Sequence, residues 1–361
     1  MGGRVRPQVH ILRLAPMLGM VRFSNWWTHK IPPLLLVVYV ELVRRHASLG
    51  QSAGALCVLV CCVSCVAAYG HVVNDWSDIA DDRRAGKANA MHGVSVGRRA
   101  ALCFALVVAG FAALAAFPDA WPARVALGLN YMWPTLYSMP RVRLKERGLL
   151  GVLSDAAGSH ITPTLFAFAV VNVFVPAPVD VVVLSAVVLW ATALGIKGIL
   201  NHQMADRAND EIAGVVTFAG AFDVSRLSAV LTRYNLCVEL SVSVFLTVAV
   251  AGFVPLAVVA LGAYLILECT KYALGFEFAL SSDARLRRAS VPFANEMFYT
   301  LWLPLAAAVQ LALQGVVFSW LPLLHAVLFR EQLAVLFADS RALCNALRAR
   351  FLPPRPRDIR Q

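Results

Sequence analysis

The sequence is poor in charged residues. Only 15% of its 361 residues are Asp, Glu, Lys or Arg, whereas 59% are hydrophobic, and the mean hydropathy is +0.68. One water-soluble core cannot hide this much apolar surface, and disordered chains do not carry apolar residues in long blocks. Soluble globular proteins and disordered proteins are therefore excluded.

The chain also lacks the cysteine pattern of a zinc site. Four of its eight cysteines lie within the apolar stretch 57–65, without paired CxxC units and their flanking turns. The N-terminal arginines are not followed by a short apolar core and a small-residue cleavage site, so we expect no cleaved signal peptide. We interpret the cysteines as packing residues.

Long apolar runs are abundant. Runs of about 18 residues can cross a bilayer core about 30 Å thick. We therefore expect an all-α fold, a polytopic membrane bundle of about nine transmembrane helices. Hydropathy predicts spans at residues 31–43, 55–73, 100–117, 121–137, 152–175, 180–200, 229–250, 253–272 and 297–315.

Basic residues indicate how these spans are oriented. The net charge is +11, and 22 of the 32 Lys and Arg residues lie in the N-terminal segment or near the loops after every second span. The opposite loops hold only Arg44, Arg45 and Arg124. By the positive-inside rule the 22 face the cytoplasm. We interpret this charge as topology and expect no nucleic-acid partner.

The C-terminal segment 316–361 does not fit this orientation. It carries the remaining seven basic residues, and with nine spans it would lie on the far side of the membrane. Apolar positions recur there at helical spacing between arginines, which favours an amphipathic helix on the membrane surface over a tenth span. Segment 1–30 is predicted to be cytoplasmic, and 31–315 to form the transmembrane domain.

An acidic motif follows the second predicted span. Asn74, Asp78 and Asp82 are spaced i, i+4, i+8, and Asp75 joins them by i+3, so one helical face presents an amide and three carboxylates. Like charges this close repel unless a cation neutralises them. Carboxylate and amide oxygens at a phosphate site suit Mg²⁺.

A second copy of the motif lies 128 residues further on. Segment 202–215 matches 74–87 at five positions, among them Asp206 and Asp210, and it too follows a span on the cytoplasmic side. This predicts a domain of two similar halves with facing metal sites. Two such sites can clamp a diphosphate and stabilise it as a leaving group, so Asp78, Asp82, Asp206 and Asp210 are the candidate catalytic residues.

A basic loop follows the fourth span. Arg141, Arg143, Lys145 and Arg147 fill it, and the positive-inside rule alone accounts for their number. Tyr137 and Ser138 stand just before the loop, at the end of the span, where both can donate hydrogen bonds to phosphate oxygens.

Together these motifs resemble the UbiA superfamily of intramembrane prenyltransferases. The resemblance rests on NDxxDxxxD at 74–82, DxxxD at 206–210 and YSxxxRxK at 137–145, and it extends from about Arg22 to the ninth span. It implies a nine-helix bundle with a central cavity capped by cytoplasmic motif-bearing loops. It also implies transfer of a prenyl group from an isoprenyl diphosphate to an acceptor.

The resemblance assigns roles to individual residues. Residues of both motifs become Mg²⁺ or diphosphate ligands, with Asp75 beside the first set. Lys87, Tyr137 and Lys145 contact the diphosphate, and Arg22 and Asn25 match a polar pair near the cavity. The expected diphosphate-binding residues are Asn74, Lys87, Tyr137, Ser138, Arg143, Lys145, Arg22 and Asn25, and the expected Mg²⁺ ligands are Asn74, Asp75, Asp78, Asp82, Asp206 and Asp210.

Other functions stay open at this point. A terpene cyclase on the same scaffold would ionise the same substrate without an acceptor, and a transporter or lipid-binding protein could use the acidic motifs for cations. Asp155 and His160 in the fifth span are either cavity-lining or helix-pairing residues. The expected partners are an isoprenyl diphosphate, an acceptor and the bilayer, with no obligate protein partner. The expected location is the bacterial inner membrane.

Overall fold

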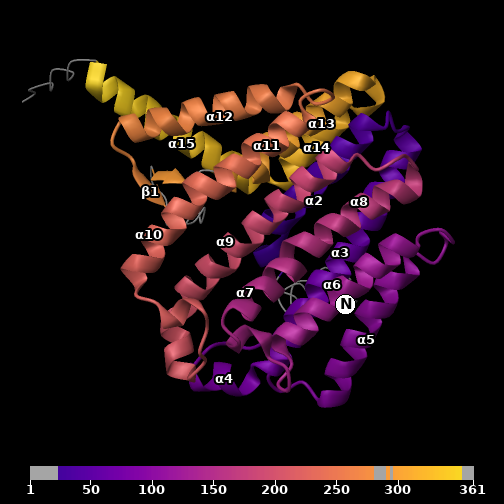
Figure 1. The fold of residues 1–361 in the computed structure, drawn as a ribbon, viewed down its shortest axis with the longest axis vertical. Coiled ribbons are helices and arrows are strands. Elements are labelled where there is room, and N and C mark those ends of the chain that lie inside the picture. The colour runs from indigo at the N-terminus through magenta and orange to yellow at the C-terminus, as the bar shows by residue number, and fades with distance from the viewer. Residues whose placement is uncertain (1–22, 280–289, 293–295, 352–361) are drawn as a thin grey trace, which may run out of the picture.

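The computed structural model describes residues 23–279, 290–292 and 296–351. This part of the chain is helical apart from one short parallel ladder, formed by β1 (Glu277–Ala279) and β2 (Ser290–Pro292). Figure 1 shows a bundle in which most long helices run side by side on a diagonal. The predicted all-α class is confirmed.

Each of the nine apolar segments predicted from hydropathy lies on a helix of the described chain. Five of the helices are long and apolar enough to cross a membrane, or six if the bent pair α14–α15 counts as one, so nine crossings stay a prediction. Counted by segment, the bundle helices are α2 (Phe23–Arg44), α3 (Leu49–Ser77), α5 (Val96–Ala112), α6 (Trp121–Ser138), α7 with η3 and α8 (Leu149–Ala156, Ala157–Ile161, Thr162–Phe174), α9 (Val181–Ala213), α10 with η5 and α11 (Val224–Tyr234, Asn235–Glu239, Leu240–Val250), α12 (Leu256–Ala273) and η6 with α13 (Phe298–Trp302, Leu303–Gln314).

Short helices form the connections and the C-terminal part. They are α4 (Ile79–Arg84), η2 (Leu144–Glu146), η4 (Ala219–Ala221), η7 (Val316–Phe318) and α14 (Trp320–Leu328), and the longer helix α15 (Arg330–Phe351) follows α14. Local capping explains several helix starts: the Ser48 hydroxyl and the Gln51 side chain form a capping box at α3, and the Asp180 carboxylate accepts from two backbone N–H groups at α9.

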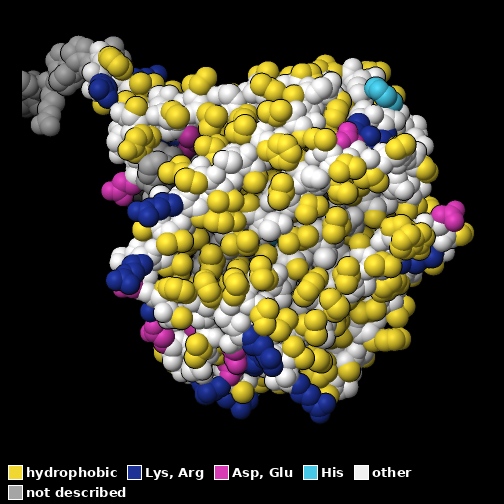
Figure 2. Space-filling model, in the orientation of Figure 1, with side chains coloured by type: hydrophobic (Ala, Val, Ile, Leu, Met, Phe, Trp, Pro, Cys, Tyr) yellow, Lys and Arg dark blue, Asp and Glu magenta, His cyan; other side chains and the backbone are white. Residues whose placement is uncertain are grey.

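The surface separates apolar from charged residues. Figure 2 shows hydrophobic side chains across the middle of the molecule and charged ones gathered along its left and bottom edges. Large apolar side chains are exposed on the bundle flanks, among them Phe104 (71%) and Val248 (66%). A water-soluble surface would not carry such a belt, whereas a surface that faces lipid does.

A buried ion cluster ties α2 to α8 at the end away from the acidic motifs. Glu41 is fully buried and pairs with Arg44 and with Arg45 Nε at 2.7 Å. The Arg45 guanidinium also donates to the Asn172 side chain and to the Val175 carbonyl. The cluster therefore closes the ends of two helices that are far apart in the sequence.

The C-terminal helices run back along α2. The Gln314 side chain donates to the Val43 carbonyl, His325 contacts Tyr39, and the Gln332 side chain donates to the Thr28 carbonyl, so the segment is antiparallel to α2. Helices α14 and α15 are bent by 75°. These contacts favour a broken tenth crossing over the surface helix that hydropathy favours.

Helix α15 then follows α12 to its last turn. Lys271 Nζ lies 2.8 Å from Asp339 Oδ2 and 2.8 Å from Glu268 Oε1, and Arg350 reaches the Ala273 carbonyl. Helix α12 ends on the same side of the bundle as α3 and α9, which carry the acidic motifs. On a tenth crossing Arg341, Arg348 and Arg350 would join the basic side, which would remove the inconsistency in the charge count.

We predict that Glu41→Gln lowers stability strongly. The change leaves the buried Arg45 guanidinium without its carboxylate, and breaking a buried pair costs about 3–5 kcal/mol. The thermal unfolding midpoint of the purified protein in detergent measures the loss. Arg44→Gln is the matched control, because the Arg44 side chain is 17% exposed, and it should shift the midpoint far less. Equal shifts would contradict a special role for the Glu41–Arg45 contact.

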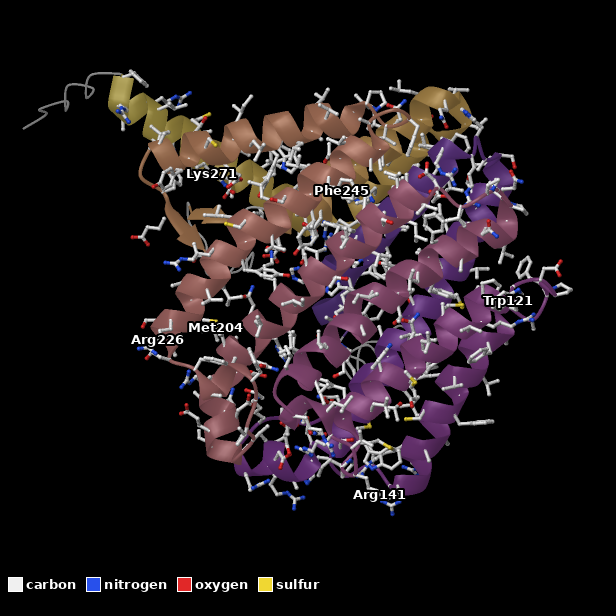
Figure 3. The ribbon with its side chains drawn as sticks, in the orientation of Figure 1. Trp121, Arg141, Met204, Arg226, Phe245 and Lys271 are labelled. Carbon is white, nitrogen blue, oxygen red and sulfur yellow. The ribbon has the colours of Figure 1, made fainter. Side chains whose placement is uncertain are left out.

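We also predict that residue 349 lies on the same side of the membrane as residue 141. Arg141 stands in the loop after α6, whereas Trp121 starts that helix at the other end of the bundle (Figure 3). Single cysteines replace Ala349, Arg141 and Asp119 in a cysteine-free variant, and an impermeant maleimide is added to one side of the membrane at a time. Positions 349 and 141 should be labelled from the same side, and position 119 from the opposite side. Labelling of position 349 together with position 119 would contradict the tenth crossing.

Candidate active site

The first acidic motif lies where a helix breaks. Helix α3 ends at Ser77 and α4 begins at Ile79; between them Asp78 has φ −99° and ψ 6°. Residues 74–82 are therefore not one continuous helix. Asn74, Asp78 and Asp82 of the predicted face nevertheless line one cavity, whereas Asp75 does not. Helix α4 crosses the bottom of the bundle toward α9 (Figure 1).

The second motif is part of one uninterrupted helix. Asp206 and Asp210 lie in the last two turns of α9, which ends at Gly214 with φ 74°, a left-handed conformation that glycine adopts without strain. The loop that follows folds back, because the buried Gln203 side chain accepts a hydrogen bond from the Ala219 backbone at 3.0 Å. The two copies of the motif thus have different backbones.

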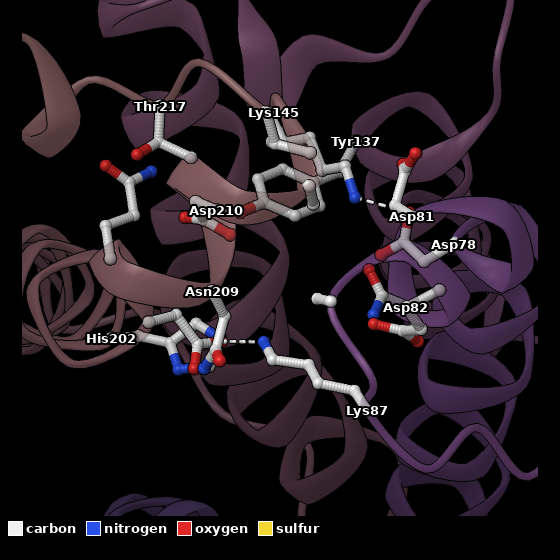
Figure 4. Close-up of a pocket in the computed structure, with 16 residues that line it drawn as sticks. Asp78, Asp81, Asp82, Lys87, Tyr137, Lys145, His202, Asn209, Asp210 and Thr217 are labelled. Atoms are coloured by element: carbon white, nitrogen blue, oxygen red, sulfur yellow. Dashed lines mark hydrogen bonds and ion pairs between the residues drawn. The ribbon is translucent and has the colours of Figure 1, made fainter.

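Both motifs face one cavity of about 780 Å³, part of it open to solvent (Figure 4). Carboxylates from α3 and α4 stand on one side and carboxylates from α9 on the other. The lining residues are Asn74, Asp78, Asp81, Asp82, Ala85, Lys87, Tyr137, Lys145, His202, Gln203, Asp206, Asn209, Asp210, Ala213, Val215 and Thr217.

Lysine side chains connect the two sides of the cavity. Lys145 Nζ lies 2.5 Å from Asp78 Oδ1, and Lys87 Nζ lies 3.4 Å from Asp206 Oδ2. Lys87 follows the first motif and Asp206 belongs to the second, so this ion pair spans the cavity. Burial raises the pKa of Asp78, and this outweighs the lowering by Lys145 and Arg143.

Arg143 is held in a strained conformation behind the carboxylates. Its φ is 44°, which costs a residue with a side chain about 1–3 kcal/mol. The guanidinium pairs with Asp81 and Glu146, and it lies 3.6 Å from Asp78. Burial raises the pKa of Asp81, but the hydrogen bonds from Arg143 and Arg84 outweigh it and hold that pKa below its usual value.

Most of the predicted site residues come together in this cavity. Asp75 and Ser138 do not line it: the Asp75 side chain is fully buried, and the Ser138 hydroxyl donates to the Asn74 side chain at 3.2 Å. Arg22 lies outside the described residues, and Asn25 is placed only by its backbone in α2. The predicted residues that do line the cavity are Asn74, Asp78, Asp82, Lys87, Tyr137, Lys145, Asp206 and Asp210.

Sequence reasoning missed several polar residues of the site. Asp81 lines the cavity, and its spacing was the signal that could have found it, because it stands seven residues after Asn74 and three after Asp78. The Asn89 side chain donates to Asp82 Oδ2 and to the Asp75 carbonyl, both at 2.7 Å, and so fixes Asp82 against the end of α3. Asn209 and Thr217 also line the cavity. Only their position within and after the second motif pointed to them.

The donor set suits Mg²⁺ that is shared with a phosphate ligand. Within the described residues no three acidic, histidine or cysteine side chains form a ready metal cage. Mg²⁺ usually takes one or two carboxylates and completes its shell with water and substrate phosphates. Paired carboxylates on opposite walls, with amide oxygens beside them, meet that requirement.

Comparisons with known proteins agree with this architecture. The family model of the UbiA prenyltransferase family matches residues 33–275. A UbiA homologue from Archaeoglobus fulgidus, solved with GPP and Mg²⁺, has a TM-score of 0.50 and 17% identity, over 84% of this chain and 99% of that one. The same homologue solved with DMAPP and Mg²⁺ has a TM-score of 0.48 and 17% identity, over 84% and 98%. No curated protein matches the chain.

The family match covers more than half of the chain, including both acidic motifs, the basic loop and the helices that carry them. The apolar helices of the chain make this protein a multi-pass integral membrane protein. The resemblance inferred from the three motifs is confirmed, and the chain belongs to the UbiA prenyltransferase family.

Proposed function

We propose that this chain is a Mg²⁺-dependent intramembrane prenyltransferase. It would ionise an allylic isoprenyl diphosphate, transfer the prenyl group to an acceptor and release pyrophosphate. The observation that carries this proposal is the cavity in which Asp78 and Asp82 face Asp206 and Asp210, with Lys87 and Lys145 between them. Carboxylates and lysines together in one cavity suit a ligand that carries both metal cations and phosphate anions.

The residues on each wall have distinct tasks. Asn74, Asp78 and Asp82 on one wall and Asp206 and Asp210 on the other would hold Mg²⁺, which supplies charge neutralisation of the diphosphate when bound. Lys87 and Lys145 lie within reach of phosphate oxygens in the same cavity, as does the Tyr137 hydroxyl. Each is a donor that stabilises negative charge as it develops on the leaving group.

The bond changes follow from this arrangement. The bond between the allylic carbon and the diphosphate oxygen breaks, and its electron pair leaves with pyrophosphate, whose charge the lysines stabilise. The acceptor then forms a bond to the allylic carbon and gives up a hydrogen as a proton. On the membrane side of the cavity the apolar bundle would shield the allylic cation from water and so limit its hydrolysis.

The comparisons support the substrate class. The Archaeoglobus fulgidus homologue with a TM-score of 0.50 was solved with GPP, an allylic diphosphate, and Mg²⁺. By the positive-inside rule the cavity would open on the cytoplasmic side of the membrane. A product formed without any acceptor would favour the cyclase alternative on the same site.

We predict that Asp78→Asn and Asp206→Asn each lower pyrophosphate release by about 100-fold or more. Each change removes one carboxylate that neutralises or positions the cation on its wall, and losses of this size are typical of electrostatic catalytic groups. Purified variants are assayed with geranyl, farnesyl and geranylgeranyl diphosphates, Mg²⁺ and a cell extract. Asp119→Asn, an exposed change at the far end of the bundle, should keep wild-type activity. Full activity in both cavity variants, with normal folding, would overturn the proposal.

We also predict that a chelator stops the reaction reversibly. With EDTA in excess, pyrophosphate release should fall to background, because the lysines alone cannot balance both the carboxylates and a diphosphate. Added Mg²⁺ should restore it. Size-exclusion chromatography in the chelator checks that the protein stays folded. Unchanged turnover in EDTA would contradict a metal-dependent ionisation.

A further inference from the structure

Three π-helical turns of the described chain converge on one part of the bundle. They are η3, η5 and η6, and each interrupts an otherwise α-helical segment. Helix α9 packs against η3 and η5 directly. It meets η6 through Tyr299, whose ring lies edge-on to Trp190 and 5.5 Å from Lys197 Nζ. Single π turns are rare and often mark functional sites, so three around one helix single out this region.

A buried ion pair lies at the centre of these turns. Lys197 on α9 is 4% exposed, Glu239 on η5 is fully buried, and Nζ and Oε1 are 3.0 Å apart. Asn235 donates to the other oxygen of Glu239. Burying an ion pair costs several kcal/mol per ion, and apolar side chains of similar size often stabilise a protein equally well. An ionisable pair inside a membrane domain is therefore a candidate for function.

The pair has hydrogen-bonding capacity left over. Within the described structure Lys197 Nζ and Glu239 Oε1 form an ion pair at 3.0 Å, and neither atom has another hydrogen-bond partner. An ammonium carries three N–H donors and a carboxylate oxygen two lone pairs, so each atom has capacity beyond this contact. A hydroxyl group accepts from an ammonium and donates to a carboxylate, so one hydroxyl satisfies both. The Trp190 and Tyr299 rings beside the pair suit an apolar body that carries this hydroxyl.

Polar residues of α7 and η3 lie on helices that pack against α9, which carries both Lys197 and the second acidic motif. Lys197 precedes Asp206 by nine residues on α9, a rise of about 13 Å. The Ser159 hydroxyl donates to Asp155 at 3.2 Å, and the next residue, His160, packs against α9 at Gly198. Gly195 permits this close approach, because a Cβ there would lie 2.8 Å from Ala156 Cα.

We propose that Lys197 and Glu239 form the acceptor-recognition site, where they bind a hydroxyl group of the molecule that receives the prenyl group. This inference rests on the proposed function, because only a transferase needs an acceptor. The reactive end of the acceptor points to the allylic carbon beside the diphosphate, and its hydroxyl lies deeper in the bundle. Lys197 and Glu239 are positioning residues: they hold the acceptor and do not touch the bond that breaks.

The test uses a double variant, Lys197→Met with Glu239→Leu. Removing both charges leaves no unpaired ion, so the double variant is expected to fold where a single one would not. The readouts are binding of geranyl thiodiphosphate with Mg²⁺, and kcat and KM for transfer of a labelled prenyl group to acceptor in a lipid extract. We expect unchanged thiodiphosphate binding and a KM for the extract raised roughly 10- to 100-fold. Thr192→Val, five residues earlier on α9, is the matched control.

Each outcome is informative. A folded double variant with wild-type KM would overturn the inference and leave the pair bridged by water or merely structural. A product whose acceptor carries no hydroxyl would also overturn it. Product formed by the wild type without extract would also overturn it, by removing the acceptor. If the wild type neither binds thiodiphosphate nor releases pyrophosphate from any of the three diphosphates, the proposed function fails first and the inference fails with it.

Discussion

Repulsion between carboxylates that face one cavity is the constraint on which the site depends. Asp78, Asp81 and Asp82 stand within five residues of each other and face Asp206 and Asp210, so folding brings five negative charges together. The structure offsets them with basic side chains from two separate segments: Lys87 after α4, and Arg143 and Lys145 after α6. Without a ligand the fold therefore needs basic side chains at this site. The same basic residues that pair with the carboxylates can bind phosphate oxygens when a diphosphate enters.

The same constraint explains why the two halves diverged. The first motif breaks its helix at Asp78 and sends α4 across toward α9, which brings Lys87 to Asp206. The second motif keeps a continuous helix and has His202 and Gln203 where the first has Asn74 and Asp75. Gln203 anchors the backbone at Ala219 and so shapes the loop that forms part of the cavity wall. One copy thus supplies most of the charge, and the other a rigid opposite wall.

Much of this was predictable because membrane proteins carry strong local signals. Apolar runs predicted where the helices lie, and the repeated aspartates predicted the two walls of the site. The rest depended on geometry that spacing does not encode. Spacing placed Asp75 beside the other carboxylates, but its side chain is buried inside the bundle, because packing decides which neighbouring carboxylate reaches the cavity. Hydropathy read Lys197 and Glu239 as parts of apolar spans, although ionisable residues at such positions are a signal in themselves. The return of α15 along α12 is visible only in tertiary contacts.

The buried charges of the bundle differ in their surroundings. Around Glu41 the arginines combine salt bridges with hydrogen bonds to Asn172 and Val175, and Lys271 pairs with Asp339 on α15, so these groups fasten one helix to another. Lys197 and Glu239 also join two helices, but they lie where three π turns meet α9. Nζ and Oε1 keep donors and lone pairs beyond their contact at 3.0 Å, and unmet hydrogen-bonding capacity in a dry interior is costly. A small polar group of a ligand can meet that capacity, which is what the proposed acceptor site requires.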